Sequence, residues 1–479
     1  MISALSWVPK GVAKVLPDTA PLPSLDEIEE LLKSKTLKNS GNSKDEGDDD
    51  MALSNEGPLD EVTAALVAAD AIGRNSGDRT GTSKVQDITG GLLELDMDHY
   101  DDEDEGIDFF GSGSLRDIID PSNDPYLKDK DDDDEEIEDM RIEPTDAIII
   151  CACNEDDVSH LEVHIYEEDS VDNEANLYVH HDIILPAFPL CTEWLDCNLK
   201  GGDKGNFIAV GSMEPEIEIW DLDVLDEVKP FMILGGKRKG KKYKEGSHTD
   251  AVLGLAWNKE FRNVLASASA DKSVKVWDIV AGKCEHTMLH HTDKVQAVAW
   301  NRQQATVLLS GSFDHSVVMM DMRTPSHEGI RWSVTADVES LAWDPHAEHS
   351  FVVSLEDGTV QGFDIRTATS GKDSGLKPSF TLHAHDKAVC TVSYNLSAPN
   401  LLATGSTDKM VKLWDISNNQ PSCIASQKPK AGAVFSISFS DDCPFLLAIG
   451  GSKGKLQIWN TLSESEVSRR FGEFAHRRS

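Results

Sequence analysis

The amino-acid sequence predicts an all-β fold, a seven-bladed β-propeller, because bulky residues recur in it at a nearly constant interval. Trp257, Trp300 and Trp343 each end a short apolar run, and successive members stand 43 residues apart. In a second series, Asp or Asn follows the bulky residue at a similar interval; its members are Trp277, Met320, Phe363, Trp414 and Trp459. A repeat of about 40–45 residues that ends in Trp-Asp is typical of WD40 propeller blades.

The strand pattern within the repeats supports the same fold. Six repeats each contain three runs of apolar or alternating residues, followed by a weaker fourth run, as half-buried strands require. In the clearest repeat the runs cover residues 251–258, 263–270, 273–279 and 283–289. In the last repeat, we expect the outer strand at residues 466–474.

A seventh blade is predicted to be split in sequence. Residues 146–154 and 160–168 match the second and third strands of a blade, and residues 175–185 suit its outer strand. No apolar run directly precedes them. Residues 2–9, however, align with the innermost strands of the other repeats and place Trp7 where Trp257 stands. A complete ring is favoured because it leaves only short, protected sheet edges.

This alignment divides the chain into three parts. We assign residues 1–9 to the inner strand of blade one, residues 10–145 to an insertion within that blade, and residues 146–479 to the remainder of the propeller. The insertion is acidic: residues 1–145 hold 38 of the 85 acidic side chains but 13 of the 45 basic ones. Such a composition predicts mostly disordered chain.

Within the insertion, three acidic runs and two amphipathic stretches stand out. The acidic runs are residues 48–50, 101–105 and 131–136, and the amphipathic stretches are residues 24–34 and 58–73. Apolar side chains on one face predict helices in both stretches. These helices either dock on the propeller or a partner, or form transiently in a solvated segment.

Two repeats contain every member of the His–Ser/Thr–Asp–Trp tetrad that joins the strands of such blades. The two sets are His248, Ser267, Asp271 and Trp277, and His385, Thr404, Asp408 and Trp414. Another repeat has His291, Ser310 and Asp314, but Met320 replaces the Trp. We interpret the tetrads as structural, since buried polar groups need partners. A nucleophile activated by a histidine would form one site and would not recur in separate blades.

The sequence predicts neither an enzyme nor a cofactor. It has no phosphate-binding Gly-rich motif, no nucleophile elbow and no zinc-protease motif. Its eight cysteines form no C-x-x-C pair, and nearby histidines lack metal-site spacing, so we expect no metal. Since the catalytic motifs are missing, we also expect no small-molecule substrate. We also expect no signal peptide and no membrane segment. Reduced, mostly buried thiols fit the cytosol or nucleus.

One basic loop interrupts the acidity between blades two and three. Residues 236–244 contain six cations, namely Lys237, Arg238, Lys239, Lys241, Lys242 and Lys244. Such a cluster suits a nuclear or nucleolar address or a contact with RNA phosphates, and Tyr243 offers one ring for stacking on a base. The alternative is a solvated loop, held by the acidic insertion of the same chain.

Two further features leave alternatives open. The acidic runs either shield basic partners such as histones or ribosomal proteins, or keep the propeller off nucleic acid, or only solubilise the chain.

Arg323 and Arg366 each follow an aspartate by two residues, which is similar to the W-D-x-R box of ubiquitin-ligase substrate receptors. Met320 and Phe363 replace the Trp of that box, and an ordinary ion pair at a strand end is the alternative.

Several segments together resemble the periodic tryptophan protein 1 family. They are ISALSWVPKGVAK, LEVHIYEED, YVHHDIILPAFPL, the basic loop, SHTDAVLGLAWNK and RNVLASASADKSVKVWD, and they span nearly the whole chain. The resemblance implies a nuclear and nucleolar propeller in ribosome biogenesis. It further implies roles in pre-rRNA processing for the large subunit, and links to rDNA chromatin and its transcription. It brings no catalytic residues.

We therefore expect a non-enzymatic scaffold of the nucleolus that binds pre-ribosomal proteins and rRNA. One alternative is a chromatin or histone-binding regulator of rDNA transcription. A third hypothesis is a ubiquitin-ligase substrate receptor.

Overall fold

The computed structural model describes residues 1–21, 140–156, 158–168, 175–201, 204–237, 242–324, 329–370 and 377–475. The chain divides into a compact unit of residues 1–23 and 131–479 and a second unit of residues 24–130. The second unit lies outside the described residues, as do the two expected helices and most of the acidic insertion. The first unit is the propeller.

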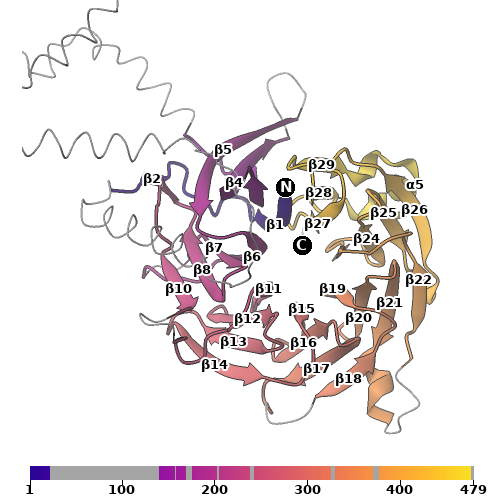
Figure 1. Ribbon diagram of the computed structural model, residues 1–479. Helices are drawn as coiled ribbons and strands as arrows, with labels where there is room; N and C mark the ends of the chain where they lie inside the picture. Colours follow the sequence, from indigo (N-terminus) through magenta and orange to yellow (C-terminus); the bar gives the residue numbers. More distant parts are fainter. Residues whose placement is uncertain are drawn as a thin grey trace, which may run out of the picture. The chain divides into compact units, whose positions relative to one another are not determined.

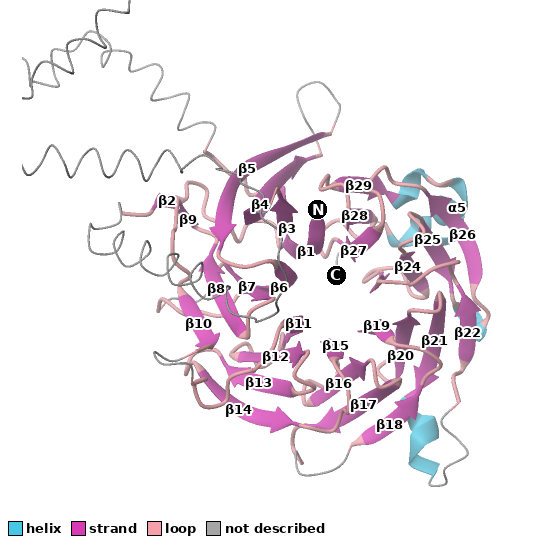
Figure 2. Cartoon of the chain, viewed as in Figure 1, coloured by secondary structure: helices cyan, strands magenta, loops and turns pink. Residues whose placement is uncertain are grey.

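The propeller consists of seven antiparallel sheets, here blades 1 to 7, arranged around a central axis (Figure 1). Strands dominate the described chain, and helical turns are few (Figure 2). From the axis outwards, blade 1 consists of β1 (Ile2–Val8), β3 (Ala147–Glu155), β4 (Val158–Glu167) and β5 (Asn176–Leu185). Blade 2 consists of β6 (Pro189–Leu195), β7 (Phe207–Ser212), β8 (Glu216–Asp221) and β10 (Met232–Gly235). Blade 3 consists of β11 (Val252–Trp257), β12 (Val264–Ser269), β13 (Val274–Asp278) and β14 (Lys283–Met288).

The remaining blades repeat this order. Blade 4 consists of β15 (Val295–Trp300), β16 (Val307–Ser312), β17 (Ser316–Asp321) and β18 (Ile330–Ser333). Blade 5 consists of β19 (Val338–Trp343), β20 (Ser350–Leu355), β21 (Thr359–Asp364) and β22 (Phe380–His383). Blade 6 consists of β23 (Thr391–Tyr394), β24 (Leu401–Gly405), β25 (Val411–Asp415) and β26 (Ser422–Gln427). Blade 7 has three strands, β27 (Val434–Phe439), β28 (Leu446–Gly451) and β29 (Gln457–Asn460). A short parallel pair, β2 (Asp18–Thr19) with β9 (Val224–Leu225), joins the segment after β1 to blade 2.

The sequence prediction of a seven-bladed propeller is confirmed, and the ring is closed. Each innermost strand contacts the innermost strand of the next blade, including β27 of blade 7 with β1 of blade 1. Apolar clusters fill the seams between blades. In the seam between blades 1 and 2, for example, Ile150 and Val163 pack with Ile208 and Trp220. The core is therefore divided among the seams, and each blade is stabilised by its two neighbours.

The innermost strand of blade 1 comes from the other side of the insertion. β1 pairs antiparallel with β3, with Leu5 opposite Cys151 and Trp7 opposite Ile149. Ile2 is fully buried and takes the place that Val434 takes in blade 7. The glycines that face these residues, Gly450 and Gly405, have no room for a Cβ, which would lie 2.5 Å from Ile2 and 2.8 Å from Val434. β1 thus occupies the same packing position as the other innermost strands.

The outer element of blade 7 is helical, so our prediction of a strand at residues 466–474 was wrong. α5 spans Ser465–Phe471, and the turn η6 covers Gly472–Phe474. Val467 and Phe471 are buried, whereas the side chain of Arg469 is 68% exposed. In a strand, residues 467, 469 and 471 would share one face, and burying the two apolar residues would bury Arg469. A helix keeps Val467 and Phe471 together at a spacing of four and turns Arg469 outwards.

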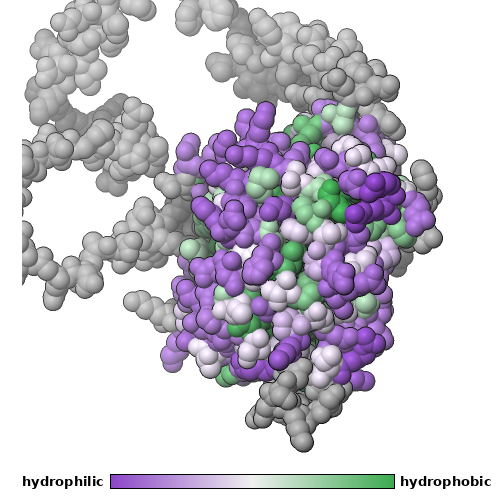
Figure 3. Space-filling model, turned by 90° about the vertical axis from the view of Figure 1, so that its right-hand side faces the viewer, coloured by the Kyte–Doolittle hydropathy of each residue, from purple (hydrophilic) through white to green (hydrophobic). Residues whose placement is uncertain are grey.

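Three further short 3-10 turns complete the described structure: η3 (Ile365–Ser370), η4 (Ser417–Asn419) and η5 (Thr461–Ser463). Within the described residues, no helix combines the length and the apolar character needed to cross a membrane. The side of the molecule shown in Figure 3 is mostly hydrophilic, and its apolar side chains form small separate patches.

Candidate functional site

The tetrad of blade 3 forms one continuous hydrogen-bonded chain. The indole N–H of Trp277 donates to Oγ of Ser267 at 2.8 Å, and this Oγ lies 2.7 Å from Nε2 of His248. Nδ1 of His248 lies 2.9 Å from the carboxylate of Asp271. Burial lowers the pKa of His248. A neutral ring that donates from Nδ1 to the carboxylate and accepts at Nε2 satisfies every member.

Blade 6 repeats this arrangement. Nδ1 of His385 lies 2.8 Å from Asp408, its Nε2 lies 2.8 Å from Oγ1 of Thr404, and Trp414 donates to the same Oγ1 at 2.9 Å. Ser267 and Thr404 are fully buried between their partners. A substrate cannot reach these hydroxyl groups. The tetrads therefore stabilise the blades through buried hydrogen bonds.

In blade 4 a second histidine takes the place of the missing tryptophan. His291 contacts Asp314 and Ser310 as in the other tetrads, at 3.0 and 2.9 Å. Met320 has no N–H group, and Nε2 of His290 lies 2.9 Å from Oγ of Ser310 instead. Burial lowers the pKa of His290 to about 4, so this ring is neutral at pH 7. The sequence analysis missed this role, because His290 lies next to His291 and outside the expected Trp position.

The tryptophan interval of the sequence corresponds to an aromatic belt at one end of the channel. Each innermost strand carries an aromatic side chain near its end; in blade order these are Trp7, Trp194, Trp257, Trp300, Trp343, Tyr394 and Phe439. Three of the indole N–H groups donate to a backbone carbonyl of the preceding blade: Trp7 to Ser438 (3.0 Å), Trp300 to Ala256 (3.1 Å) and Trp343 to Ala299 (3.1 Å). The belt therefore joins neighbouring blades.

The residue after the belt position makes a link in the opposite direction. The side-chain amide of Asn258 donates to Ala305 of the next blade at 2.7 Å, and that of Asn301 donates to Glu348 at 2.8 Å. In blade 5 this position is Asp344, which has no N–H group. There His346 provides the link, with its Nε2 3.2 Å from the carbonyl oxygen of Asn395 in blade 6.

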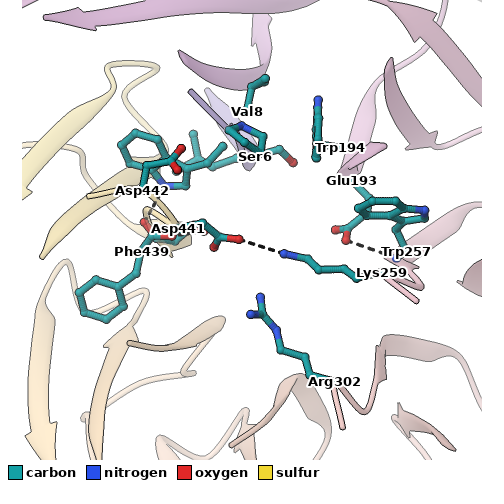
Figure 4. A pocket seen from close by; sticks show the side chains of 14 residues that line it. Ser6, Val8, Glu193, Trp194, Trp257, Lys259, Arg302, Phe439, Asp441 and Asp442 are labelled. Atoms are coloured by element: carbon teal, nitrogen blue, oxygen red, sulfur yellow. Dashed lines mark hydrogen bonds and ion pairs between the residues drawn. The ribbon is translucent and has the colours of Figure 1, made fainter. Parts of the chain in front are cut away.

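Four belt residues, Trp7, Trp194, Trp257 and Phe439, line a cavity of about 190 Å³ that contains charges of both signs (Figure 4). Nζ of Lys259, from blade 3, forms an ion pair at 2.9 Å with Asp441 of blade 7, across the channel mouth. Arg302 of blade 4 points into the same space and forms no ion pair with a described residue. Asp442 accepts the backbone N–H of Lys10 at 2.7 Å. This mouth therefore brings charged groups of both signs into one cavity.

Glu193 lies in the wall of this mouth, beside Trp194 and Trp257, whose rings contact edge to face at 5.8 Å (Figure 4). Burial raises the pKa of Glu193 to about 7. The backbone N–H of Trp257, which donates to this carboxyl at 3.3 Å, and the charges of Lys259 and Arg302 act in the opposite direction. The protonation state of Glu193 consequently changes near neutral pH.

The structure fixes both ends of the basic loop. Lys237 and Tyr243 form an antiparallel bridge, and the backbone N–H of Lys244 donates to Gly236 at 2.9 Å. Lys237 also forms an ion pair with Glu214 at 3.2 Å. Lys242 and Lys244 are exposed and form no ion pair with a described residue. The other three predicted cations, Arg238, Lys239 and Lys241, lie outside the described residues.

Comparison with known proteins identifies the family. Periodic tryptophan protein 1 of Saccharomyces cerevisiae is 32% identical to this chain over 98% of the chain and 90% of its own length. The periodic tryptophan protein 1 homologue of Drosophila melanogaster is 31% identical over 98% and 96%. The chain belongs to the periodic tryptophan protein 1 family. An uncharacterised WD repeat-containing protein of Schizosaccharomyces pombe is 37% identical over 98% of this chain and 91% of its own length.

The WD repeats of this periodic tryptophan protein 1 family member are uneven. The family described as WD domain, G-beta repeat, matches residues 240–278, 282–321, 376–415 and 421–460, which correspond to blades 3, 4, 6 and 7. Blades 3, 4 and 6 are those with the buried His–Asp pair. The fold and the family together make the chain a WD40 scaffold-type protein suited to protein–protein interaction.

The two arginines of the W-D-x-R-like segments bind to their own strand ends. Nε of Arg323 donates to Asp321, and Nε of Arg366 donates to Asp364, each at 3.0 Å, with a second contact from Nη2. Both arginine side chains are largely exposed. The ubiquitin-ligase hypothesis stays a prediction, and adaptor binding by the double alanine variant would test it.

The sequence analysis expected no metal and missed one cluster of potential metal ligands. Cys153 of β3 and His160 and Glu162 of β4 bring their Sγ, ring-nitrogen and carboxylate-oxygen atoms within 4.8 Å of one another. The hydrogen bond from His164, with a smaller one from His160, lowers the pKa of Glu162 to about 2, although burial acts in the opposite direction. The signal in the sequence was the alternation His-x-Glu-x-His, because alternate residues of a strand share one face.

We expect the substitution Glu193→Gln to flatten the pH dependence of stability. The folded carboxyl keeps its proton up to about pH 7, whereas an unfolded Glu loses it near about pH 4.3. Between these values the folded state binds more protons, so the free energy of unfolding falls as pH rises. The full shift corresponds to at most about 4 kcal/mol, and partial exposure reduces it.

Melting temperatures between about pH 4 and pH 8 check this prediction. The wild-type chain should lose more stability than Glu193→Gln over this interval. Glu260→Gln, at an exposed position next to Lys259 in the sequence, is the control and should follow the wild type. Parallel curves for the wild type and Glu193→Gln would contradict the assignment.

Proposed function

We propose that this chain is a non-enzymatic WD40 scaffold of the nucleus and nucleolus that acts in ribosome biogenesis, in pre-rRNA processing and assembly of the large subunit. Its propeller binds pre-ribosomal proteins, and its basic loop contacts rRNA phosphates. The observation that carries the proposal is the basic loop between blades 2 and 3, whose two ends pair with each other while the chain around it is acidic. The resemblance to the periodic tryptophan protein 1 family supports it.

The described contacts divide the cations of the loop into two groups. Lys237 pairs with Glu214, and this contact raises the pKa of Lys237. Its charge is partly compensated within the chain. Lys242 and Lys244 are exposed without such a partner among the described residues. Phosphate oxygens attract uncompensated cations and release counterions on binding. We therefore assign phosphate contact to Lys242 and Lys244 before Lys237.

The experiment replaces all six cations, Lys237, Arg238, Lys239, Lys241, Lys242 and Lys244, by glutamine. If each of the six cations neutralises one phosphate of single-stranded RNA, the plot of log affinity against log salt should become less steep, and the magnitude of its slope should fall by about 4. RNA co-sedimentation and nucleolar retention should both fall. A control chain carries six glutamine substitutions at exposed lysines of other blades, Lys283, Lys294, Lys387, Lys409, Lys430 and Lys455.

The outcomes separate the possible roles of the loop. Reduced RNA binding in the loop variant but not in the control supports the proposal. Loss of nucleolar retention with unchanged RNA binding would make the loop an address only. If neither property changes, the loop has no part in the function. Lys237→Gln alone should have a smaller effect than the pair Lys242→Gln and Lys244→Gln.

The acidic insertion favours a second candidate, a chromatin or histone-binding regulator of rDNA transcription. Residues 1–145 contain 38 acidic side chains, which can compete with nucleic acid for basic proteins. Pull-downs with histones and with basic ribosomal proteins, using the full chain and a chain without residues 40–140, distinguish the candidates. Histone binding that depends on residues 40–140, without ribosomal-protein binding, would favour the second.

A further inference from the structure

We propose that blade 1 binds a zinc ion through Cys153, His160 and Glu162. This site is independent of the proposed function, and it lies on the face of the blade that is directed towards blade 7. Neighbouring residues of that face, Cys151 and Ile149, pack with Ile2 and with Leu456 of blade 7 in one apolar cluster.

The antiparallel register of β3 and β4 creates the cluster. His160, Glu162 and His164 are alternate residues of β4, so their side chains leave the strand on one face. Cys153 lies directly opposite His160, and Cys151 lies opposite Glu162. Directly opposed residues on one face have Cβ atoms about 4.5–5.5 Å apart. Two neighbouring strands therefore present a thiol, an imidazole and a carboxylate to one point.

The side-chain geometry brings the ligand atoms together. Sγ of Cys153, a ring nitrogen of His160 and a carboxylate oxygen of Glu162 lie within 4.8 Å of one another. Nε2 of His160 is 3.2 Å from Oε1 of Glu162. A tetrahedral zinc with bonds of about 2.0–2.3 Å needs ligand atoms about 3.3–3.8 Å apart, so the widest of these separations must shorten by about 1 Å through side-chain rotation. The side chains of His160 and Glu162 are 14% and 20% exposed, which leaves an entry path.

His164 completes the site as the residue that orients Glu162. Its Nε2 lies 2.9 Å from Oε2 of Glu162, the oxygen that does not contact His160. The residue is 7% exposed, and no described group forms a hydrogen bond with its buried Nδ1. Ligating carboxylates in metal sites are held in this way by an outer partner. A buried ring nitrogen without a partner is costly in a purely hydrogen-bonded network.

The ligand set selects the metal. One thiolate, one imidazole and one carboxylate are the nitrogen, sulfur and oxygen donors that Zn²⁺ accepts, whereas Mg²⁺ and Ca²⁺ prefer oxygen alone. Three protein ligands leave the fourth tetrahedral position to water. Binding displaces the proton of the Cys153 thiol, which leaves as a solvated proton while the Zn–S bond forms.

The position in the ring gives the ion a structural task. Blade 7 has three strands, so its sheet has no fourth strand opposite the outer part of blade 1. β4 and β5 each have ten residues, and Val158 and Ile184 on the zinc-binding face are 51% and 68% exposed. An ion shared by β3 and β4 fastens this long, weakly covered hairpin to the inner part of the blade.

The test uses the full-length chain, freed of metal with EDTA and then dialysed with Zn²⁺ or Co²⁺. We expect one Zn²⁺ per chain by elemental analysis. With Co²⁺ we expect the absorption of a thiolate-to-cobalt charge transfer, which only a cysteine ligand produces. Cys153→Ser and His160→Ala should lose the metal and the absorption. His164→Ala should bind Zn²⁺ about 10–100-fold more weakly.

Two controls keep the result interpretable. Cys423→Ser removes an exposed cysteine of blade 6 and should retain both the metal and the absorption. Melting curves of the metal-free wild type, Cys153→Ser and His160→Ala show whether each variant folds, and Zn²⁺ should raise the melting temperature of the wild type alone. The proposal would be overturned if the wild-type chain retained no Zn²⁺, or if Cys153→Ser and His160→Ala retained as much Zn²⁺ as the wild type.

Discussion

A chain that lacks residues 1–9 should lose at least about 5 kcal/mol of folding free energy, because three large, buried apolar side chains leave the core with the strand. Ile2, Leu5 and Val8 are 0%, 8% and 2% exposed. Removing one large buried hydrophobic side chain costs about 2–5 kcal/mol. The deletion also exposes the backbone edge of β3 and opens the ring between blades 7 and 1.

Chemical denaturation of the two chains measures this effect through the midpoint of unfolding. The matched control is a chain without residues 40–130, in which β1 and its connection to β2 are kept. It should unfold at the midpoint of the wild type, since the deleted residues belong to the second compact unit. A peptide of residues 1–21, added to the shortened chain, should restore part of the loss. An unchanged midpoint after deletion of residues 1–9 would refute the role of β1.

The substitution His248→Ala should destabilise the propeller by about 3–5 kcal/mol, the usual cost of leaving one partner of a buried pair uncompensated. His248 is fully buried, and its removal deprives both Asp271 and Ser267 of a hydrogen bond. The cavity left by the ring adds to the cost. His385→Ala in blade 6 should have a similar effect, and neither substitution should alter RNA binding.

The pH dependence of this effect follows from Asp271. Burial acts to raise the pKa of Asp271, but hydrogen bonds from His248 and Ser273 lower it overall. A lowered folded pKa contributes stability that is present above the ordinary value of about 3.9 and is lost as pH falls below it. The difference between wild type and His248→Ala should therefore be largest near neutral pH and shrink in acid.

Thr335→Ala is the matched control for the tetrad prediction. Thr335 precedes blade 5 as His248 precedes blade 3, and its hydroxyl donates to Asp357 at 3.0 Å. Thr335 is exposed, so water replaces the lost contact and the cost should stay below about 1 kcal/mol. If His248→Ala and Thr335→Ala lost the same free energy of unfolding, the buried tetrad would contribute no more to stability than an exposed hydrogen bond.

The number of blades and the role of Trp7 could be predicted because the tryptophan interval records a packing constraint. Three belt residues, Trp7, Trp300 and Trp343, reach the preceding blade through their indole N–H groups, and the bulky position recurs in each blade. Ile2 and Trp7 satisfy the same constraint despite the long insertion. The tetrads were predictable for a similar reason, since the spacing of 23 residues between His248 and Asp271 recurs between His385 and Asp408.

Contacts that occur once could not be predicted in this way. The ion pair between Lys259 and Asp441 joins residues 182 positions apart, and no repeat marks it. His290, in the connection between β14 and β15, replaces a tryptophan of a strand. α5 replaces a strand, and this keeps Arg469 exposed. The cluster at Cys153 depends on the register of β3 and β4, which a list of cysteine spacings does not contain.

The split blade also constrains how the protein can be made. During synthesis β1 emerges long before β3, and both precede β27, to which the ring closes. The indole of Trp7 finds its acceptor, Ser438, 431 residues later in the chain. A fold with contacts this distant in sequence forms slowly and leaves apolar strands uncovered meanwhile. The growing chain therefore carries an uncovered apolar face of blade 1 on the ribosome until almost the whole propeller has been translated.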